Sequence, residues 1–321
     1  LHLKKGIFAM ATVLPNDDFD AEAAADELRN ATKGFGTDEE RIIRVLSSHD
    51  NEQRQEIKLQ FKQKYGEDLE DCLKSELGGD FEEVVMALMD PPRTFDAKEL
   101  HRAVKGAGTE ESTLIEVMCT RSNDQIGEIK EIYQQLFESE LEEDITGDTG
   151  GYLKRLLVSQ TTASRSEDED VDEDLAKEEA QAIYDAGEGQ LGTDESTISG
   201  VLCTRSWAQL RATFDAYREL AETDIEDALR SEASGTLEDA YLVVVKYAKD
   251  PVAFFAERLH DSMAGGGTND SQLIRVIVSR SEIDLEDIKS KYEEMYESPL
   301  SSAIEGDCGG DYKRMLLALV G

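Results

Sequence analysis

The chain carries one sequence pattern four times, and this repetition limits its fold more than any other feature. Each copy opens with a glycine and a threonine, followed by polar residues and an apolar segment: Gly36-Thr37, Gly108-Thr109, Gly192-Thr193 and Gly267-Thr268. The four glycines are 72, 84 and 75 residues apart. Self-similarity at a regular spacing is the mark of a repeat protein, in which each copy is one unit of supersecondary structure. We therefore expect the 321 residues to form four related units.

The interior of each unit has the periodicity of helices. Apolar residues in the segment 42–46 are spaced i, i+1, i+3 and i+4, and the same spacing returns in the fourth unit, which is typical of a helix face. The threonine at each opening, with acids close behind, predicts a helix N-cap. Ser122 with Gln125, and Ser206 with Gln209, predict capping boxes. No long stretch alternates as a strand does. The predicted fold class is all-α, with about five helices in each unit.

A run of acids lengthens the spacing between the second and third units. Residues 167–179 contain nine acids and one lysine, a composition typical of a solvated, flexible linker. The expected organisation is a tail over residues 1–19, repeats over 20–90 and 91–162, a linker over 163–179, and repeats over 180–250 and 251–321. For residues 1–9 we expect a cloning remnant or a disordered tail, because the apolar stretch there is too short for a signal peptide.

An acidic residue follows the opening glycine by 40 residues in every unit: Glu76, Asp148, Glu232 and Asp307. The glycine-rich turn permits positive φ angles, so that several backbone carbonyls can point inward together. With one bidentate carboxylate from a second loop, such a turn makes an all-oxygen cage suited to Ca²⁺, which takes roughly six to eight oxygen ligands. The cage is incomplete, and water or a lipid phosphate oxygen could fill its open positions. Four agreements at one spacing favour this hypothesis over unrelated surface acids.

The composition argues against several other functions. The 71 acids against 34 lysines and arginines give a net charge of −37, whereas nucleic-acid binding relies on cations that meet phosphates. No apolar run approaches the roughly 20 residues of a membrane-spanning helix. The four cysteines form no Cys-x-x-Cys pair, so a reducing, cytosolic setting is expected. Motifs of a catalytic nucleophile, a Walker loop or a zinc protease are missing from the sequence, so we do not expect an enzyme.

The loops, the acid 40 residues on, and a Thr-Arg-Ser motif at residues 120–122 and 204–206 make the chain resemble an annexin over about residues 20–321. The resemblance implies four annexin repeats of five helices each, arranged as a slightly curved disc with its calcium loops on the convex face. It also implies calcium-dependent binding to acidic phospholipid of the phosphatidylserine type. The implied Ca²⁺ ligands are the carbonyls of Thr32, Gly34 and Gly36 with the Glu76 carboxylate, of Val104, Gly106 and Gly108 with Asp148, of Gly187, Gln190 and Gly192 with Glu232, and of Met263, Gly265 and Gly267 with Asp307.

The resemblance also assigns residues around the loops. Membrane contact is implied for Lys33, Phe35, Lys105 and Leu191. Thr37 and Glu39 would hold a weaker accessory Ca²⁺, although a first-turn acid stabilised by the helix dipole explains Glu39 equally well. The implied location is the cytoplasm, with peripheral attachment to membranes when Ca²⁺ rises and an unconventional extracellular pool. A protein partner for the N-terminal tail and self-association on membranes are further expectations.

Four charged residues match the lining of the central pore of annexins: Asp96, Glu116, Arg121 and Arg275. The alternative function is therefore calcium-regulated ion conduction through this pore. Because buried charges tend to pair, we favour a structural network of salt bridges for these side chains. The first repeat departs from the pattern of the others, because His49 stands where they have an arginine at 121, 205 and 280.

Overall fold

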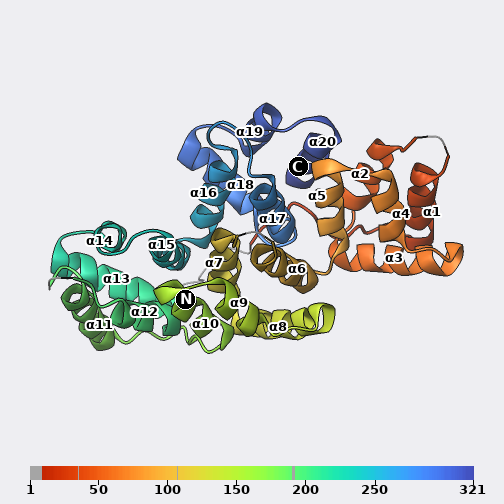
Figure 1. Ribbon diagram of the computed structural model, residues 1–321. Helices are drawn as coiled ribbons and strands as arrows, with labels where there is room; N and C mark the ends of the chain where they lie inside the picture. The colour runs from red at the N-terminus through yellow and green to blue at the C-terminus, as the bar shows by residue number, and fades with distance from the viewer. Residues whose placement is uncertain (1–8, 35, 107, 190–191) are drawn as a thin grey trace, which may run out of the picture. The chain divides into compact units, whose positions relative to one another are not determined.

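The computed structural model describes residues 9–34, 36–106, 108–189 and 192–321. Over these residues the chain forms twenty α-helices and no strand, which confirms the all-α fold class (Figure 1). Among the described helices, none combines the length and the apolar character needed to cross a membrane. Phe35, Gln190 and Leu191, which the sequence assigned to the calcium loops, lie outside the described residues.

Five helices follow one another in each repeat. The first repeat contains α1 (Ala21–Thr32), α2 (Glu39–Ser47), α3 (Asn51–Tyr65), α4 (Leu69–Glu76) and α5 (Gly79–Met89). The second contains α6 (Pro92–Val104), α7 (Glu111–Thr120), α8 (Asn123–Phe137), α9 (Leu141–Asp148) and α10 (Gly151–Thr161). The third contains α11 (Glu173–Ala186), α12 (Glu195–Thr204), α13 (Trp207–Ala221), α14 (Ile225–Glu232) and α15 (Thr236–Lys249). The fourth contains α16 (Pro251–Met263), α17 (Asp270–Arg280), α18 (Leu285–Tyr296), α19 (Leu300–Asp307) and α20 (Gly310–Val320).

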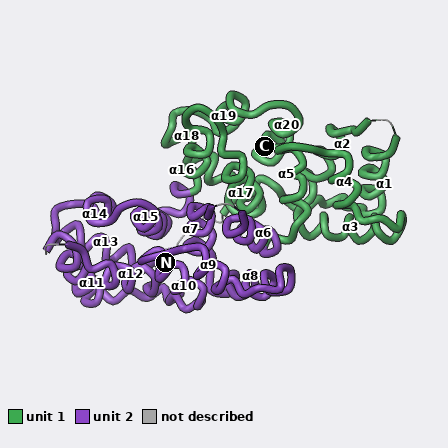
Figure 2. Tube along the Cα trace, in the orientation of Figure 1, with its two compact units in different colours: residues 1–92, 255–321 green, residues 93–254 purple. Residues whose placement is uncertain are grey.

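The helices form two compact units, each built from two repeats (Figure 2). Unit 1 comprises residues 1–92 and 255–321, which hold the first and fourth repeats, and unit 2 comprises residues 93–254, which hold the second and third. In unit 1, α2 packs against α20 and α17 against α5. In unit 2, α7 packs against α15 and α10 against α12. The repeats at the two ends of the chain therefore share one unit.

The apolar positions that predicted helices form the cores of these units. Ile42 and Leu46 of α2 are fully buried, and so are Leu273 and Ile277 of α17. Each of these side chains lies on the face that its helix turns toward the rest of unit 1. Burial of such a side chain contributes about 1.5–3 kcal/mol to folding, so these helices are held mainly by packing rather than by their own propensity.

The acidic segment between the second and third repeats is shorter than the predicted linker of residues 163–179, because it ends where a helix begins. Helix α11 begins at Glu173, and residues 173–179 of the expected linker are its first turns. The backbone of Asp172 donates to Gln209 Oε1 at 2.8 Å and accepts from Gln209 Nε2 at 2.9 Å. Upstream, the amide of Ser166 donates to the carbonyl of Thr204 at 2.9 Å. The number of acidic side chains in this segment does not indicate which hydrogen bonds its backbone makes.

The N-terminal segment is fixed to unit 1 in the same manner. The backbone of Asn16 donates to Gln53 Oε1 at 2.9 Å and accepts from Gln53 Nε2 at 3.0 Å. Ahead of it, the amide of Met10 donates to Asp287 Oδ2 at 2.8 Å, and the amide of Thr12 donates to the carbonyl of Ser281 at 2.9 Å. The expected tail is therefore attached to the first and fourth repeats from Met10 onward, while residues 1–8 lie outside the described part of the chain.

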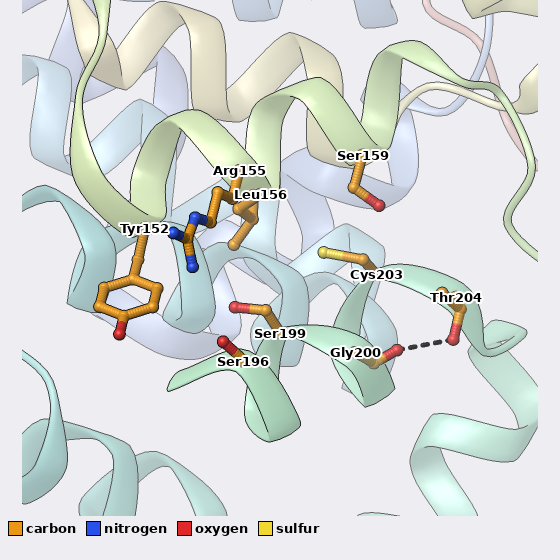
Figure 3. Close-up of a pocket in the computed structure, with 9 residues that line it drawn as sticks. All are labelled: Tyr152, Arg155, Leu156, Ser159, Ser196, Ser199, Gly200, Cys203 and Thr204. Carbon is orange, nitrogen blue, oxygen red and sulfur yellow. Dashed lines mark hydrogen bonds between the residues drawn. The ribbon is translucent and has the colours of Figure 1, made fainter. Parts of the chain in front are cut away.

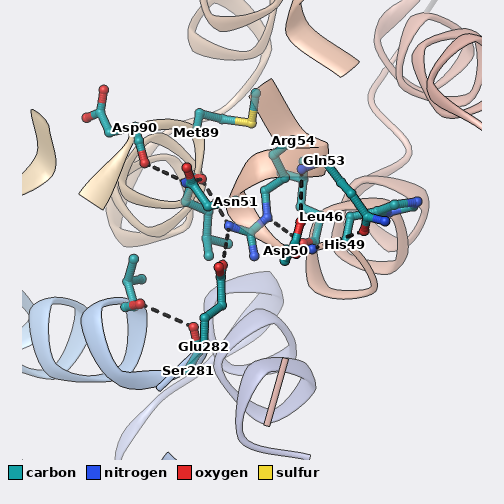
Figure 4. Close-up of polar contacts among 12 residues, drawn as sticks. Leu46, His49, Asp50, Asn51, Gln53, Arg54, Met89, Asp90, Ser281 and Glu282 are labelled. Atoms are coloured by element: carbon teal, nitrogen blue, oxygen red, sulfur yellow. Dashed lines mark hydrogen bonds and ion pairs between the residues drawn. The ribbon is translucent and has the colours of Figure 1, made fainter. Parts of the chain in front are cut away.

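Arg54 of α3 links the two repeats of unit 1 (Figure 4). Its side chain is 1% exposed, donates to the carbonyls of Leu46 at 2.9 Å and Leu88 at 3.2 Å, and pairs with Glu282 of the fourth repeat at 3.2 Å. Burial lowers the pKa of Arg54 below its ordinary value, and the Glu282 carboxylate only partly offsets this effect. The contact therefore fixes the first repeat against the start of α18 through a buried charge.

Candidate calcium sites

A loop joins the first and second helices of every repeat, and a backbone hydrogen bond closes its base. In the four loops this bond runs from Asp38 N to Ala31 O at 2.9 Å, from Glu110 N to Ala103 O at 2.9 Å, from Asp194 N to Ala186 O at 2.7 Å, and from Asn269 N to Ser262 O at 2.7 Å. The carbonyl that accepts it belongs to the residue just before the first predicted ligand. The loop is thus closed by a carbonyl that does not belong to the predicted ligands.

The predicted glycine ligands adopt the backbone conformation on which the cage hypothesis depends. In the first loop Gly34 and Gly36 have φ angles of 123° and 88°, and the paired glycines of the second and fourth loops are also positive. In the third loop Gly192 is positive at 88°, whereas Gly187 has a φ of −117°. Residues other than glycine rarely adopt such positive angles, so the loop path of the first, second and fourth repeats requires the glycines.

The predicted acid is the last residue of the fourth helix in every repeat: Glu76 of α4, Asp148 of α9, Glu232 of α14 and Asp307 of α19. The threonine that follows the last loop glycine donates its hydroxyl to this acid. The hydroxyl of Thr37 bonds Glu76 Oε2 at 3.1 Å, that of Thr193 bonds Glu232 Oε2 at 2.7 Å, and that of Thr268 bonds Asp307 Oδ2 at 2.9 Å. In the second repeat Thr109 bonds the backbone carbonyl of Asp148 at 3.0 Å instead.

These contacts correct the predicted role of the threonines. The N-cap of the second helix is the next residue, and Asp38, Asp194 and Asn269 each accept a backbone amide there. The reason is that the threonine hydroxyl has a tertiary partner, the acid 39 residues on. The constant interval between threonine and acid was the signal that could have revealed this contact. Thr37 thus touches the main carboxylate, although the sequence placed it only in an accessory site.

In the third repeat a glycine is required by the acid itself. A Cβ atom added to Gly187 would lie 2.9 Å from Glu232 Cγ and 3.2 Å from Glu232 Cδ, which is closer than real Cβ contacts. The Glu232 side chain therefore lies directly against the start of the loop. Burial, followed by the charges of Glu188 and Glu232, raises the pKa of Tyr217 to about 12. Negative potential is concentrated at this loop, as a cation site requires.

Like charges also crowd the fourth loop. Burial raises the pKa of Asp270, and the neighbouring charges of Asp80 and Asp307 raise it further, against a hydrogen bond from Tyr312. Burial and the same acids raise the pKa of the Cys308 thiol to about 11. Negative charges held together in this way repel one another, and a divalent cation would relieve that repulsion.

The remaining predicted ligands lie at helix ends. Thr32, Val104 and Met263 are the last residues of α1, α6 and α16. Carbonyls in the last turn of a helix have no partner within that helix, so they are suited to an external cation. Among the described residues, no three His, Cys, Asp or Glu side chains gather as a metal site. A donor set of one carboxylate with backbone carbonyls would fit Ca²⁺, and the ligand set of each loop stays a prediction.

Other predicted positions lie at the surface of the loops. Lys33 and Lys105 are exposed, and Glu39 is the first residue of α2, where its charge favours the positive end of the helix dipole. The accessory site at Thr37 and Glu39, and membrane contact by the lysines, stay predictions.

Asp96 and Arg121 of the polar set form a buried ion pair inside unit 2. Asp96 is 1% exposed and accepts Arg121 Nη2 at 2.8 Å and Nε at 3.1 Å. Burial lowers the pKa of Arg121, but the Asp96 charge and hydrogen bonds outweigh burial, so this pKa is raised. Glu116 is buried in the same unit, while Arg275 is buried in unit 1. The observed pair agrees with the structural interpretation of these two residues.

The residues that correspond to Asp96 and Arg121 have different partners in the other repeats. Arg205 pairs with Glu179, which stands at the position of Asp96 in the third repeat. In the fourth repeat that position is Phe255, and Arg280 stacks on its ring at 4.6 Å while it pairs with Asp284 at 2.5 Å. In the first repeat both partners are replaced, by Ala24 and His49. His49 lies edge-on to Phe19 at 5.4 Å between ring centroids.

A sequence model described as annexin matches residues 22–88, 95–159, 178–244 and 254–319, in register with the four loops and their acids. The chain belongs to the annexin family. This family is known for calcium-dependent binding to phospholipid. Its four matches fall within the four five-helix repeats of the structure, so the predicted fold of four annexin repeats is confirmed.

Individual annexins are similar along nearly the whole chain. Human annexin A13 is 50% identical over 302 residues, which cover 94% of this chain and 96% of that protein. Human annexin A7 is 48% identical over 97% of this chain, which covers 64% of the longer relative. Among solved structures, annexin III superposes with a TM-score of 0.95 at 41% identity and covers 98% of both chains. A calcium-bound annexin (Sm)1 has a TM-score of 0.85 at 35% identity and covers 98% of this chain and 93% of that one.

Proposed function

We propose that this annexin attaches to acidic phospholipid membranes through Ca²⁺ held by its four loops. The observation that carries this proposal is the contact between the loop threonine and the acid at the end of the fourth helix, which recurs in all four repeats. It brings two segments that are 40 residues apart into one site. The calcium-bound structure of the related annexin (Sm)1 supports the choice of ion.

Each proposed site offers one carboxylate and a set of carbonyls, so it neutralises only part of a divalent charge. Bound Ca²⁺ supplies the positive charge that the protein lacks at these loops. Carbonyls and one carboxylate leave coordination positions open, and phosphate oxygens of a lipid head group suit them because Ca²⁺ prefers oxygen ligands in a flexible shell. The affinity for Ca²⁺ alone is therefore weak, and the membrane completes the coordination.

Multivalency then makes membrane attachment depend more steeply on the Ca²⁺ concentration. Once one loop has attached, the others meet the membrane at a high effective concentration. Lys33, Lys105, Phe35 and Leu191 are proposed to contact the bilayer beside the ions. The proposed location follows from this behaviour: the cytoplasm, with peripheral attachment when Ca²⁺ rises. Partners of the N-terminal segment and self-association on the membrane are part of the same proposal.

The test is sedimentation with phosphatidylserine vesicles in Ca²⁺ and in chelator. We expect the protein to pellet with vesicles only in Ca²⁺, and attachment that ignores chelator would refute the mechanism. Glu76→Gln combined with Asp307→Asn should raise the Ca²⁺ concentration needed for half-maximal attachment while the far-ultraviolet circular dichroism stays unchanged. The matched control, Glu56→Gln combined with Glu293→Gln, changes the same charge at exposed positions of α3 and α18 and should leave that concentration unchanged.

A further inference from the structure

A pocket of about 190 Å³ opens at the surface of unit 2, between α10 of the second repeat and α12 of the third (Figure 3). At about 30 Å³ for each water molecule in the liquid, this volume corresponds to roughly six waters. The pocket is distinct from the calcium loops, since none of the predicted ligands lines it. Its lining is mostly apolar, with Leu156 and Cys203 among the walls.

On α12 the pocket is lined by side chains smaller than those at the matching positions of its counterpart in unit 1. Helices α20 and α2 of unit 1 pack against each other as α10 and α12 do in unit 2. The register of the repeats aligns Ser199 and Gly200 of α12 with Ile43 and Arg44 of α2. A Cβ atom added to Gly200 would meet no heavy atom within 4 Å. The space is therefore open at a position that has a large side chain in the related pair.

Arg155 is the only charged residue in the lining of this pocket. Its counterpart on α20, Arg314, pairs with Asp311. In unit 2 the position of Asp311 is occupied by Tyr152, and the Arg155 guanidinium lies 5.1 Å from the centre of that ring. Arg155 makes no ion pair or hydrogen bond with the described residues. The Arg155 guanidinium is exposed and therefore accessible to an external anion.

Polar groups for such an anion surround the guanidinium. Figure 3 shows Arg155 pointing from α10 toward Ser196 and Ser199 on α12. Ser199 donates its hydroxyl to the Tyr241 oxygen at 2.8 Å, because the Tyr241 hydrogen goes to the carbonyl of Glu195 at 3.0 Å. Ser196 is therefore the serine whose hydroxyl can donate to a ligand. Guanidinium and hydroxyl groups are among the groups that proteins use to hold phosphate.

We propose that this pocket binds the phosphate group of an organic phosphate ester. The Arg155 guanidinium would hold two phosphate oxygens in a bidentate manner, Ser196 would donate its hydroxyl, and the apolar walls would cover the attached carbon atoms. The ester is either a phospholipid head group or a free metabolite, since both present the same chemistry.

The first experiment is a nuclear magnetic resonance titration with sn-glycerol 3-phosphate, in excess chelator and without lipid. We expect saturable shifts of backbone amides in segments 152–159 and 196–204. Arg155→Gln should weaken this binding about tenfold or more, because a charge-assisted contact is lost. Gly200→Leu should abolish it by filling the pocket, with no loss of thermal stability. The matched control Arg314→Gln, in unit 1, should bind as the unaltered protein does.

The second experiment identifies the source of the ester, and this arm alone rests on the proposed function. If Arg155→Gln raises the phosphatidylserine concentration needed for attachment in Ca²⁺, and Arg314→Gln does not, the ligand is a lipid head group. If attachment is unchanged while glycerol phosphate still binds, the ligand is a soluble ester. Absence of saturable shifts in the first experiment, or equal weakening by Arg314→Gln, overturns the proposal whatever the vesicles do. Because that experiment contains neither Ca²⁺ nor lipid, failure of the proposed function would not affect it.

Discussion

The hydroxyl of Thr193 holds Glu232 against the third loop at 2.7 Å, the shortest of the four threonine–acid contacts. Replacement by valine keeps the shape of the side chain and removes the donor. We expect Thr193→Val to weaken Ca²⁺ binding at the third loop by about 2- to 12-fold, the equivalent of a typical hydrogen bond of 0.5–1.5 kcal/mol. A nuclear magnetic resonance titration with Ca²⁺ that follows the amide of Gly192 measures this change.

The other three loops serve as controls inside the same molecule, because their amides should shift at unaltered Ca²⁺ concentrations. A second control is Thr197→Val, which removes a hydroxyl bound to Asp194 Oδ2 at 2.8 Å in the same repeat but away from Glu232. If Thr197→Val weakens Ca²⁺ binding at the third loop as much as Thr193→Val does, the hydroxyl of Thr193 has no special role in that binding.

The buried pair of Asp96 and Arg121 gives a prediction on stability. Asp96→Ala leaves an uncompensated buried guanidinium, so we expect the free energy of unfolding to fall by about 3–5 kcal/mol. Adding Arg121→His reproduces Ala24 and His49 of the first repeat, and the double variant should recover part of the loss. Urea denaturation of the single and double variants measures this coupling. A double variant less stable than Asp96→Ala alone would contradict it.

Sequence spacing was sufficient to predict the four acids and the loop glycines, because both follow from a local turn and a constant interval. It could not predict the acceptor of each threonine hydroxyl, because that acceptor lies in a distant segment of the chain. Nor could it predict that Asp148 accepts through its backbone carbonyl while its counterparts accept through their carboxylates. Such choices depend on distances of a few tenths of an ångström.

At the scale of the helices, the third helix of every repeat ends in the left-handed conformation. The capping residue is Gly66 in the first repeat, with a φ of 72°, but Glu222 holds the same place in the third with a φ of 55°. A left-handed residue other than glycine costs about 1–2 kcal/mol. We therefore expect Glu222→Gly to raise the free energy of unfolding by about 1 kcal/mol in thermal or urea denaturation.

Whether glycine raises or lowers the free energy of unfolding depends on its position in the helix, and a second position therefore provides the control. Glu219 is exposed within α13, one turn before the cap. There glycine brings only its entropic disadvantage, so Glu219→Gly should lower the free energy of unfolding by about 1 kcal/mol. If both variants change stability in the same direction, the capping argument does not hold.

The helices themselves were predictable because their apolar positions repeat with helical spacing. The capping box of Ser122 and Gln125 was predicted and is present. That of Ser206 and Gln209 was only half right, because Ser206 accepts the amide of Gln209 while the Gln209 side chain bonds Asp172. The Gln209 side chain can reach either its own helix or a distant backbone segment. Packing decides which of the two partners it bonds, and the local sequence does not contain that information.

At the scale of the whole molecule, the net charge of −37 opposes attachment to an acidic surface. Four Ca²⁺ ions would add only eight positive charges, so attraction has to be local and short-ranged. We expect no pelleting with phosphatidylserine vesicles in chelator even at low ionic strength. A nonspecific electrostatic contact would instead strengthen as salt is lowered.

Cooperativity should decline as sites are removed. Amide replacements at one, two and then three of Glu76, Asp148, Glu232 and Asp307 should make the dependence of vesicle attachment on Ca²⁺ progressively shallower, because fewer loops act together. Sedimentation across a Ca²⁺ series measures the slope. A slope that stays constant until the last acid is replaced would show that one loop alone carries attachment.

The repeats and their family were predictable from the chain, but their pairing was not. The first and fourth repeats share unit 1 through contacts such as Arg54 with Glu282 and Met10 with Asp287. These partners are more than 200 residues apart in the sequence, and no local pattern marks one as the partner of the other. The pocket beside Arg155 was missed for the same reason, since it depends on two helices from different repeats.

The threonine–acid contacts also bear on the speed of the response. Each loop is joined to its acid by a hydrogen bond of the protein itself, so we expect binding of Ca²⁺ to require neither the formation of a helix nor the docking of a segment. The time to occupy a loop is then set by diffusion of the ion and loss of its water shell, which are far faster than the microsecond-to-millisecond motions of whole elements. Attachment should therefore follow a brief calcium pulse almost without delay, and the lag that remains belongs to the encounter with the membrane.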